Sequence, residues 1–265
     1  MSINSYLENL SSKLVIKDSE KNSIKLSIET LQKRINLFFN DIEEHFYFGS
    51  YTRGTILPRK ADSNSDIDYM IVFKNPNQYK PQTFLNNLRN FAKKYYSTSE
   101  IYQSHPTLVL ELNHIKFELV PAYKTNVIFI TQYNIPAPST FYEDWMYTSP
   151  NNFNDSLISA NKRSDNKLKP LIRLIKYWNA LNEHVYSSYE LEQHLINTCT
   201  PYFNTSIKDY FYSAVDNLPF PHNISDSKKS KIHSFKKSIS TIKLYDRLDW
   251  NPNIENNIKN VLPPI

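Results

Sequence analysis

The sequence predicts an α+β protein in which a mixed, twisted sheet with flanking helices is followed by a helical bundle. Residues 22–42 repeat apolar positions at helical spacing, β-rich runs follow at 45–48, 66–73 and 107–120, and the apolar stripes beyond about residue 130 are helical again. We expect a first lobe over residues 1–145 and a helical lobe over 146–265, with a ligand site in the cleft between them.

The first long helix is predicted over residues 22–42. Its apolar residues are spaced alternately by four and three and form one stripe: Ile24, Ile28, Leu31, Ile35, Phe38 and Ile42. Asp18 or Ser19 stands near its start and can cap it. Residues 45–48 then fit a short strand, residues 55–65 a polar loop, and residues 66–73 a second strand.

The middle of the chain alternates between helical and extended patterns. Apolar side chains lie at helical spacing within residues 83–96. Two β-rich runs, 107–112 and 115–120, flank the dipeptide Asn113-His114 and predict a hairpin. Residues 127–130 form another candidate strand, and three prolines within residues 134–152 indicate a crossover to the second lobe: Pro136, Pro138 and Pro150.

The second lobe is predicted from helical stripes. Leu168, Leu171, Ile172 and Ile175 form one stripe, and further helices are expected over residues 189–199 and 205–217. The helix that contains Leu168 also carries three basic residues spaced by four and three: Lys169, Arg173 and Lys176. The simplest interpretation of this basic stripe is a solvated helix face. The lysine-rich segment 228–237 is also expected to be solvated.

Composition narrows the class of protein. The formal charge is +5, from 31 basic and 26 acidic residues, which suits polyanionic ligands such as nucleoside triphosphates without establishing nucleic-acid binding. The single Cys199 excludes an internal disulfide and a cysteine zinc site, so a reducing cytosol is expected. The first residues lack a signal-peptide pattern and no apolar run reaches membrane-span length, so we expect a cytoplasmic protein without a membrane partner.

The chain has only two glycines, and both lie in the segment Gly49-Ser50-Tyr51-Thr52-Arg53-Gly54. Ordinary proteins contain roughly 7% glycine. Glycine adopts positive φ and lets main-chain N–H groups approach a ligand closely, so this turn requires backbone freedom. Asp66-Ile67-Asp68 follows and opens an apolar run. A glycine turn followed by paired carboxylates on a strand indicates phosphate held near a divalent metal.

Asp66 and Asp68 point to the same face of the predicted strand because strand side chains alternate. Two carboxylates so close repel each other unless a cation or a proton lies between them, and Mg²⁺ takes one or two carboxylates plus substrate phosphates. Glu118, on the second arm of the hairpin, is the expected third carboxylate, with Glu111 on the other arm as the fallback. An Asp-x-Asp pair alone is more often a solvated strand edge, but the glycine turn and Glu118 reverse that preference.

These segments resemble the signature of the DNA polymerase β-like nucleotidyltransferase superfamily: Phe48-Gly49-Ser50, Asp66-Ile67-Asp68-Tyr69 and Phe117-Glu118-Leu119. Within it, residues 49–55 and 66–73 look like the cGAS/DncV-like nucleotidyltransferases (CD-NTases) of bacterial CBASS anti-phage defence. Residues 171–179 and 187–192 are similar to two further family blocks. The resemblance covers roughly residues 45–200 and implies a polymerase β-like catalytic lobe joined to a helical lobe.

The resemblance also implies a role for each matched residue of the first lobe. Gly49 and Ser50, with the adjacent backbone amides, would hold triphosphate oxygens, as a nest of N–H groups does in other phosphate sites. Asp66, Asp68 and Glu118 would bind Mg²⁺, with Mn²⁺ as the alternative metal, and carry the catalysis.

In the helical lobe, the resemblance implies that Lys176 and Ser188 reach the triphosphate and that Tyr189 stacks on the donor base. The residues alone leave other interpretations open. Ser187 and Glu190 fit a capping box, which makes Ser188 another helix-start residue. A tyrosine at a helix start usually packs against its neighbours.

By resemblance, the expected activity is the joining of nucleoside triphosphates into a cyclic di- or trinucleotide second messenger for anti-phage signalling. A downstream effector would respond to the product, and an RNA or protein activator is a candidate partner. One alternative is a nucleotidyltransferase that modifies a macromolecular acceptor, such as tRNA or a protein hydroxyl, with 228–237 as part of a basic surface. The other is a non-catalytic nucleotide sensor of the same fold, which the intact Asp66/Asp68 pair disfavours.

Overall fold

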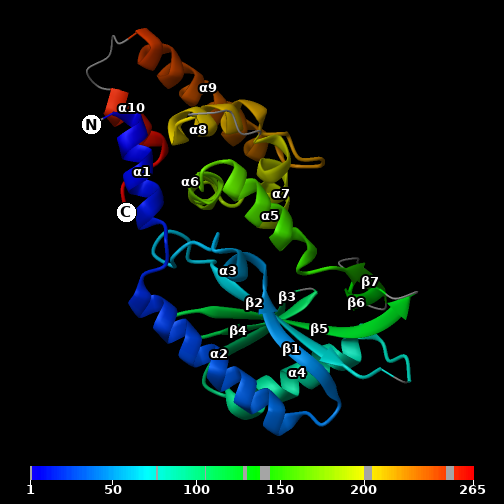
Figure 1. Cartoon of the computed structure of the whole chain (residues 1–265). Helices are drawn as coiled ribbons and strands as arrows, with labels where there is room; N and C mark the ends of the chain where they lie inside the picture. Colours follow the sequence, from blue (N-terminus) through cyan, green and yellow to red (C-terminus); the bar gives the residue numbers. More distant parts are fainter. Residues whose placement is uncertain are drawn as a thin grey trace. The chain divides into compact units, whose positions relative to one another are not determined.

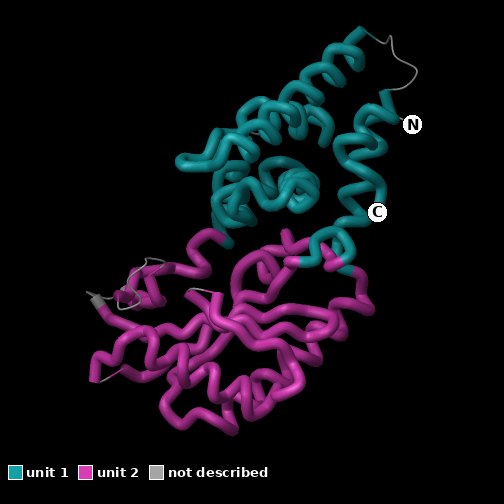
Figure 2. Tube along the Cα trace, turned by 180° about the vertical axis from the view of Figure 1, so that it is seen from behind, with its two compact units in different colours: residues 1–16, 60–63, 154–265 teal, residues 17–59, 64–153 magenta. Residues whose placement is uncertain are grey.

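The computed structural model describes residues 2–75, 77–104, 106–127, 130–137, 144–199, 205–248 and 254–265. Contacts divide the chain into two compact units, coloured separately in Figure 2. The sheet unit comprises residues 17–59 and 64–153, and the helical unit comprises residues 1–16, 60–63 and 154–265. The chain therefore passes from one unit to the other at residues 16–17, 59–60, 63–64 and 153–154.

The sheet unit contains one mixed sheet, which the sequence predicted. Its strands are β1 (Ile42–Phe48), β2 (Asp66–Phe73), β3 (Glu100–Ser104), β4 (Thr107–Glu111), β5 (Lys116–Val127), β6 (Ile130–Pro136) and β7 (Trp145–Thr148). They hydrogen-bond in the order β1-β2-β5-β4-β3, and β6 pairs with both β5 and β7. β2 and β5 are parallel, whereas the other described pairs are antiparallel. The hairpin predicted around Asn113-His114 is confirmed as β4–β5.

Two helices cover one face of this sheet, α2 (Asp18–Phe38) and α4 (Pro81–Tyr95), which lie below the strands in Figure 1. Aromatic rings form the contact: the Phe73 ring of β2 lies 4.9 Å from the Phe84 ring of α4 and 5.1 Å from that of Phe39. Tyr69 and Ile67, four and six positions before Phe73, are fully buried on the same face.

The opposite face of β2 has two different halves. Met70 and Val72 pack with Ala122 of β5 in a small apolar cluster. Nearer the start of the strand, Asp66 and Asp68 occupy the same face and are only partly buried. The apolar half anchors the strand, and the acidic half is available for ligands.

Helix α2 begins and ends four residues before its predicted bounds of 22–42. Asp18 is its first residue, and Lys17 occupies the N-cap position without a side-chain cap, so the predicted cap by Asp18 or Ser19 is wrong. Phe39 leaves the helix with φ −102° and ψ 133°, and Ile42 begins β1. An isoleucine at position 42 fits both the helical stripe and the strand, which is why periodicity overextended the helix.

The crossover predicted for residues 134–152 is wrong in part, because β6 and β7 lie there and pair with each other. Pro136 stands at the last position of β6, opposite Trp145, and the next amide, that of Ala137, donates to the Asp144 carbonyl at 2.9 Å. The missing N–H of the proline therefore does not end the pairing. Of the candidate strand at 127–130, Val127 ends β5 and Ile130 begins β6. Residues 128–129 and Pro138 lie outside the described residues.

The helical unit is arranged around α6 (Leu168–Leu181), most of whose side chains are buried. The other helices of the unit are α1 (Ile3–Lys13), α5 (Asn152–Arg163), α7 (Ser188–Thr198), α8 (Ile207–Asn217), α9 (Asp226–Leu248) and α10 (Ile254–Val261). The predicted helices at 189–199 and 205–217 are thus confirmed as α7 and α8. Within the described residues, none of the helices combines the length and apolar character that crossing a membrane requires.

Helix α1 belongs to the helical unit, whereas the sequence placed residues 1–145 together in the first lobe. Ile3, Leu7 and Leu10 of α1 are at most 2% exposed, and the helix contacts α6, α8 and α10. The contacts also place the boundary at 153–154, in the first turn of α5, rather than at 145–146. The sequence of α1 does not indicate these contacts, because α6, α8 and α10 lie far from it along the chain.

The lysine-rich segment 228–237 is part of α9, and several of its ammonium groups have protein partners. Lys228 donates to the carbonyl of His184 at 3.0 Å, and Lys236 to the carbonyl of Asp216 at 3.0 Å. Asp216 lies in the last turn of α8, where the helix dipole favours a cation, and His184 lies three residues beyond the end of α6. The segment therefore attaches α9 to its neighbours in addition to facing solvent.

Candidate functional site

The glycine turn is a single short helix, α3 (Gly49–Arg53), placed directly after β1. Gly49 and Gly54 have φ values of +73° and +69°, so both glycines occupy the left-handed region as the sequence indicated. A Cβ atom added to Gly49 would lie 1.8 Å from Oδ2 of Asp68. Position 49 therefore has no room for any side chain while Asp68 holds its place.

The backbone of the turn is fixed by its own hydrogen bonds. The Ser50 carbonyl accepts from the amides of Thr55 and Ile56 at 3.0 and 3.1 Å, and Thr52 Oγ1 donates to the Gly49 carbonyl at 2.8 Å. Ser50 itself is 9% exposed. The turn thus holds the Gly49 backbone against the Asp68 carboxylate in one defined conformation.

The three expected carboxylates come together on one face of two adjacent strands. In the parallel pairing of β2 with β5, Asp66 lies opposite Lys116 and Asp68 opposite Glu118. Opposite residues in a ladder share a face, so Asp66, Asp68, Lys116 and Glu118 form a patch of three acids and one base. The neighbours that alternate with them are buried on the other face.

Within this patch, Lys116 contacts two of the acids, which also lie within hydrogen-bonding reach of each other. Its Nζ is 3.5 Å from Oδ2 of Asp66 and 3.8 Å from Oε1 of Glu118. Burial, followed by the negative charge of Asp66, raises the pKa of Glu118 to about 7, although Lys116 acts in the opposite direction. The patch therefore holds more negative charge than one lysine neutralises, and it favours a further cation or a proton.

The residues present fit Mg²⁺ or Mn²⁺ by their chemistry. Both are oxygen-seeking ions, and three carboxylates on one sheet face supply oxygen ligands. The side chains are not closed around an ion: among the described residues, no three His, Cys, Asp or Glu side chains are grouped closely enough to hold a metal. Asp66 and Glu118 face Lys116 instead, and Asp68 lies against Gly49.

The fallback acid, Glu111, has a different partner. It stands on β4 opposite Lys116, but its Oε1 accepts from Arg59 Nη2 at 2.9 Å. The Arg59 amide in turn donates to Glu20 of α2 at 3.2 Å. Glu111 thus anchors the loop before β2, which leaves Glu118 as the third acid of the patch.

Lys176, Ser188 and Tyr189 belong to the helical unit. Lys176 Nζ lies 3.0 Å from Oε1 of Glu192, and the two side chains are 6% and 0% exposed. This buried ion pair ties α6 to α7, so the basic stripe containing Lys176 is not the solvated helix face that the spacing suggested. The role expected for Lys176 at a triphosphate must coexist with this partner.

The start of α7 agrees with part of the sequence analysis. Ser187 is the N-cap, and its hydroxyl accepts from the Glu190 amide at 3.3 Å. Ser188 is therefore the first helical residue, beside the cap rather than the cap itself. Tyr189 is 54% exposed, which leaves its ring accessible for stacking on a base.

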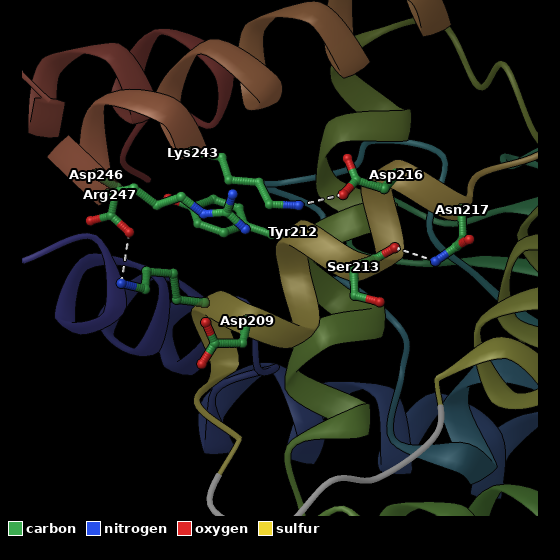
Figure 3. Close-up of a pocket in the computed structure, with 9 residues that line it drawn as sticks. Asp209, Tyr212, Ser213, Asp216, Asn217, Lys243, Asp246 and Arg247 are labelled. Atoms are coloured by element: carbon green, nitrogen blue, oxygen red, sulfur yellow. Dashed lines mark hydrogen bonds and ion pairs between the residues drawn. The ribbon is translucent and has the colours of Figure 1, made fainter.

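A cavity of about 470 Å³ lies elsewhere in the helical unit, between α8 and α9 (Figure 3). Lys208 pairs with Asp246 at 2.7 Å and Lys243 with Asp216 at 2.6 Å along its walls. Because acids and bases neutralise each other there, the cavity offers little charge for a polyphosphate. None of the residues expected at the catalytic site lines it.

Sequence reasoning did not select Lys116, Glu192 or Arg59. A usable signal existed for Lys116, since it precedes Glu118 by two positions and must share its face on a strand. No comparable signal existed for Glu192 or Arg59, because their partners lie far along the chain.

Residues 1–161 match the family of Second Messenger Oligonucleotide or Dinucleotide Synthetase domains. A probable cyclic nucleotide synthase of Bacillus cereus (strain VD146) is 34% identical over 101 residues, which are 37% of this chain and 30% of that protein. A cyclic AMP-AMP-AMP synthase of Acinetobacter sp. (strain ATCC 27244 / 9458) is 22% identical over 149 residues, or 54% of this chain and 42% of that protein. The matches thus span less than half the length of these curated relatives.

Solved structures share the fold over nearly the whole chain. CdnC of E. coli MS115-1, solved with ATP, has a TM-score of 0.70 at 12% identity and covers 97% of this chain and 96% of its own. The same protein was also solved in complex with HORMA-deltaN, with a TM-score of 0.68. At this identity the likeness concerns the fold, and the polymerase β-like arrangement expected from the sequence is confirmed.

The contact between Gly49 and Asp68 predicts a large difference between the two glycines. Gly54→Ala places an alanine at positive φ and should cost about 1–2 kcal/mol of folding stability. Gly49→Ala adds the collision with Asp68 and should cost at least about 3 kcal/mol. Urea unfolding of both variants tests this, and equal losses would show that Asp68 moves away freely.

The raised pKa of Glu118 predicts a stability that depends on pH in EDTA. In the unfolded chain this carboxyl titrates near 4.5, and in the folded chain near 7. Ionised Glu118 therefore opposes folding above pH 7, and the penalty disappears below pH 4.5. Glu118→Gln should gain stability over wild type between pH 5 and 8, by up to about 3 kcal/mol. Parallel pH curves for the two proteins in thermal unfolding would contradict this.

The buried pair of Lys176 and Glu192 predicts a structural cost when one partner is removed. Lys176→Met removes the cation that lies 3.0 Å from the buried Glu192 carboxylate and should destabilise the helical unit by about 3–5 kcal/mol. Lys176→Met combined with Glu192→Leu should recover most of that loss, because both charges of the pair are then removed. Denaturant unfolding of the single and double variants measures both effects, and a stable single variant would mean that the pair contributes little.

Proposed function

The chain belongs to the family of Second Messenger Oligonucleotide or Dinucleotide Synthetase domains, and from that membership we propose that it is a metal-dependent nucleotidyltransferase. The proposed reaction joins nucleoside triphosphates into a cyclic di- or trinucleotide. The observation that supports it most is the acidic patch beside the glycine turn. Asp66, Asp68 and Glu118 share one face of β2 and β5, and the Gly49 backbone lies so close to Asp68 that position 49 has no room for a side chain.

The proposed chemistry is an in-line displacement at phosphorus. A ribose hydroxyl oxygen attacks the α-phosphate of a nucleoside triphosphate, a new phosphoester bond forms, and the bond to pyrophosphate breaks. Bound Mg²⁺ or Mn²⁺ would supply charge stabilisation for the leaving pyrophosphate and lower the pKa of the attacking hydroxyl. Asp66, Asp68 and Glu118 are the residues that would hold it. Glu118 would complete the metal set nearest the attacking hydroxyl and help to activate it, and the hydroxyl proton would pass to solvent.

Other residues are proposed to bind the nucleotide. Gly49 and Ser50 would present backbone amides to the triphosphate, since no side chain can stand at position 49. In the helical unit, Ser188 would add a hydroxyl and Tyr189, which is exposed, would stack on the base. Lys176 would contribute charge that Glu192 already neutralises in part, so its proposed role is smaller than that of the carboxylates.

The biological setting is proposed by relation to the family. The product would act as a second messenger on a downstream effector in cytoplasmic anti-phage signalling. A protein activator is a natural candidate, because the structurally similar CdnC of E. coli MS115-1 has been solved in complex with HORMA-deltaN. An RNA activator is the other candidate.

The macromolecular acceptor is the weaker alternative. It would draw on the basic segment 228–237, but Lys228 and Lys236 from this segment bind carbonyls at or just beyond the ends of α6 and α8. The non-catalytic sensor is weaker still, because the three carboxylates are all present and share one face.

The activity can be tested with purified protein, all four nucleoside triphosphates, and Mg²⁺ or Mn²⁺. We expect phosphatase-resistant cyclic oligonucleotides by mass spectrometry, and at least a hundredfold less product from Asp66→Asn/Asp68→Asn, because removing metal ligands removes charge stabilisation. A matched control is Glu43→Gln/Glu44→Gln, which removes two acids from β1, where they pair with Lys124.

Two outcomes would redirect the proposal. Transfer of labelled nucleotide to added tRNA or protein would favour the macromolecular acceptor. Nucleotide binding without turnover, with metals, RNA and candidate protein activators all supplied, would favour the sensor.

A further inference from the structure

Resting on the function proposed above, we propose that Lys116 is an internal counter-cation of the acidic patch that competes with the metal. In the absence of nucleotide its ammonium group contacts both Asp66 and Glu118 and weakens the binding of a divalent cation. Metal would then bind well only together with a triphosphate, which brings negative charge of its own. Lys116 is in this sense a positioning residue, since it acts through the carboxylates.

The first support is the place of Lys116 in the sheet. The register of β2 with β5 puts it opposite Asp66, and strand alternation puts it on the same face as Glu118. Its side chain is 12% exposed, less than Asp66 at 27% or Glu118 at 26%. The ammonium group is therefore confined to the patch and cannot extend freely into solvent.

The second support is the length of its contacts. The Nζ of Lys116 is 3.5 Å from Asp66 and 3.8 Å from Glu118, both longer than the usual range for an N–H···O hydrogen bond. Lys176, by contrast, lies 3.0 Å from Glu192. Lys116 is thus shared between two carboxylates by electrostatic attraction, an arrangement that a divalent ion can displace.

The third support is the charge balance of the neighbourhood. Glu111 also stands opposite Lys116 in the sheet, but Arg59 binds its carboxylate at 2.9 Å. The charge of Lys116 is therefore directed to Asp66 and Glu118. Because the interaction between charges falls with distance and a dication would bind the same oxygens, the ammonium and the metal must repel each other.

The test measures Mn²⁺ binding to nucleotide-free protein at pH 8 by electron paramagnetic resonance of the free ion. Lys116→Met keeps the length of the side chain and removes its charge, and we expect it to tighten Mn²⁺ binding by about tenfold or more. Lys116→Arg keeps the charge and should bind Mn²⁺ about as weakly as wild type. The combination of Lys116→Met with Asp68→Asn should lose the gain, which locates the ion in the patch.

The matched control is Lys124→Met. Lys124 lies on the same strand, β5, is 24% exposed, and also faces two carboxylates, Glu44 at 3.0 Å and Glu43 at 3.9 Å. Its removal should leave Mn²⁺ affinity unchanged. A lysine with a merely structural role would, when removed, weaken metal binding or leave it alone, so a gain of affinity specific to position 116 is diagnostic.

Unchanged or weaker Mn²⁺ binding in Lys116→Met would overturn the inference, and Lys116→Gln repeats the measurement if the methionine variant does not fold by circular dichroism. The result is separate from the proposed function. A gain of affinity in a protein that makes no nucleotide product would keep the inference and reject the synthase. Product formation with unchanged Mn²⁺ affinity in Lys116→Met would do the reverse.

Discussion

The parallel register of β2 with β5 is the constraint on which the candidate site depends. It sets Asp68 opposite Glu118 and Asp66 opposite Lys116. A slip of one residue would turn one set of charged side chains toward the helices, because strand side chains alternate between faces. Ile67 and Phe117, both fully buried on the covered face, oppose such a slip. The geometry of the polar face is thus fixed by the apolar packing behind it.

The sequence allowed the acids to be placed on one face, but pairing their strands required more than periodicity. Alternation alone put Asp66 and Asp68 on one face, and the hairpin put Glu118 on a strand. The family resemblance implied that the three acids bind one metal, but the pairing of their strands was not predicted. The burial of Lys176 could not be predicted, because its partner Glu192 lies on another helix. The four-residue difference between the predicted and observed bounds of α2 could not be predicted either, since Ile42 fits the apolar pattern of a helix and of a strand.

Lys176 and Lys116 illustrate how lysine ion pairs can have different roles. Lys176 and Glu192 are almost completely removed from water at a distance of 3.0 Å, so each side chain requires the other and neither is easily released. Lys116 is held more loosely by two partners that remain a quarter exposed. The tight pair joins two helices of the fold, whereas the loose one leaves its carboxylates available for exchange with other cations. Distance and exposure together separate the two cases.

The docking of α1 on the helical unit has a consequence for how the chain is made. Its partners α6, α8 and α10 all lie beyond residue 167, so the buried face of α1 is synthesised long before anything can cover it. At ribosomal speeds of about 5–20 residues per second, about 150 residues separate the two events by roughly 8–30 seconds. During that interval the sheet unit, contained within residues 17–153 apart from a four-residue excursion, can fold between them. The packing of α1 in the helical unit can therefore be completed only after α6, α8 and α10 have been synthesised.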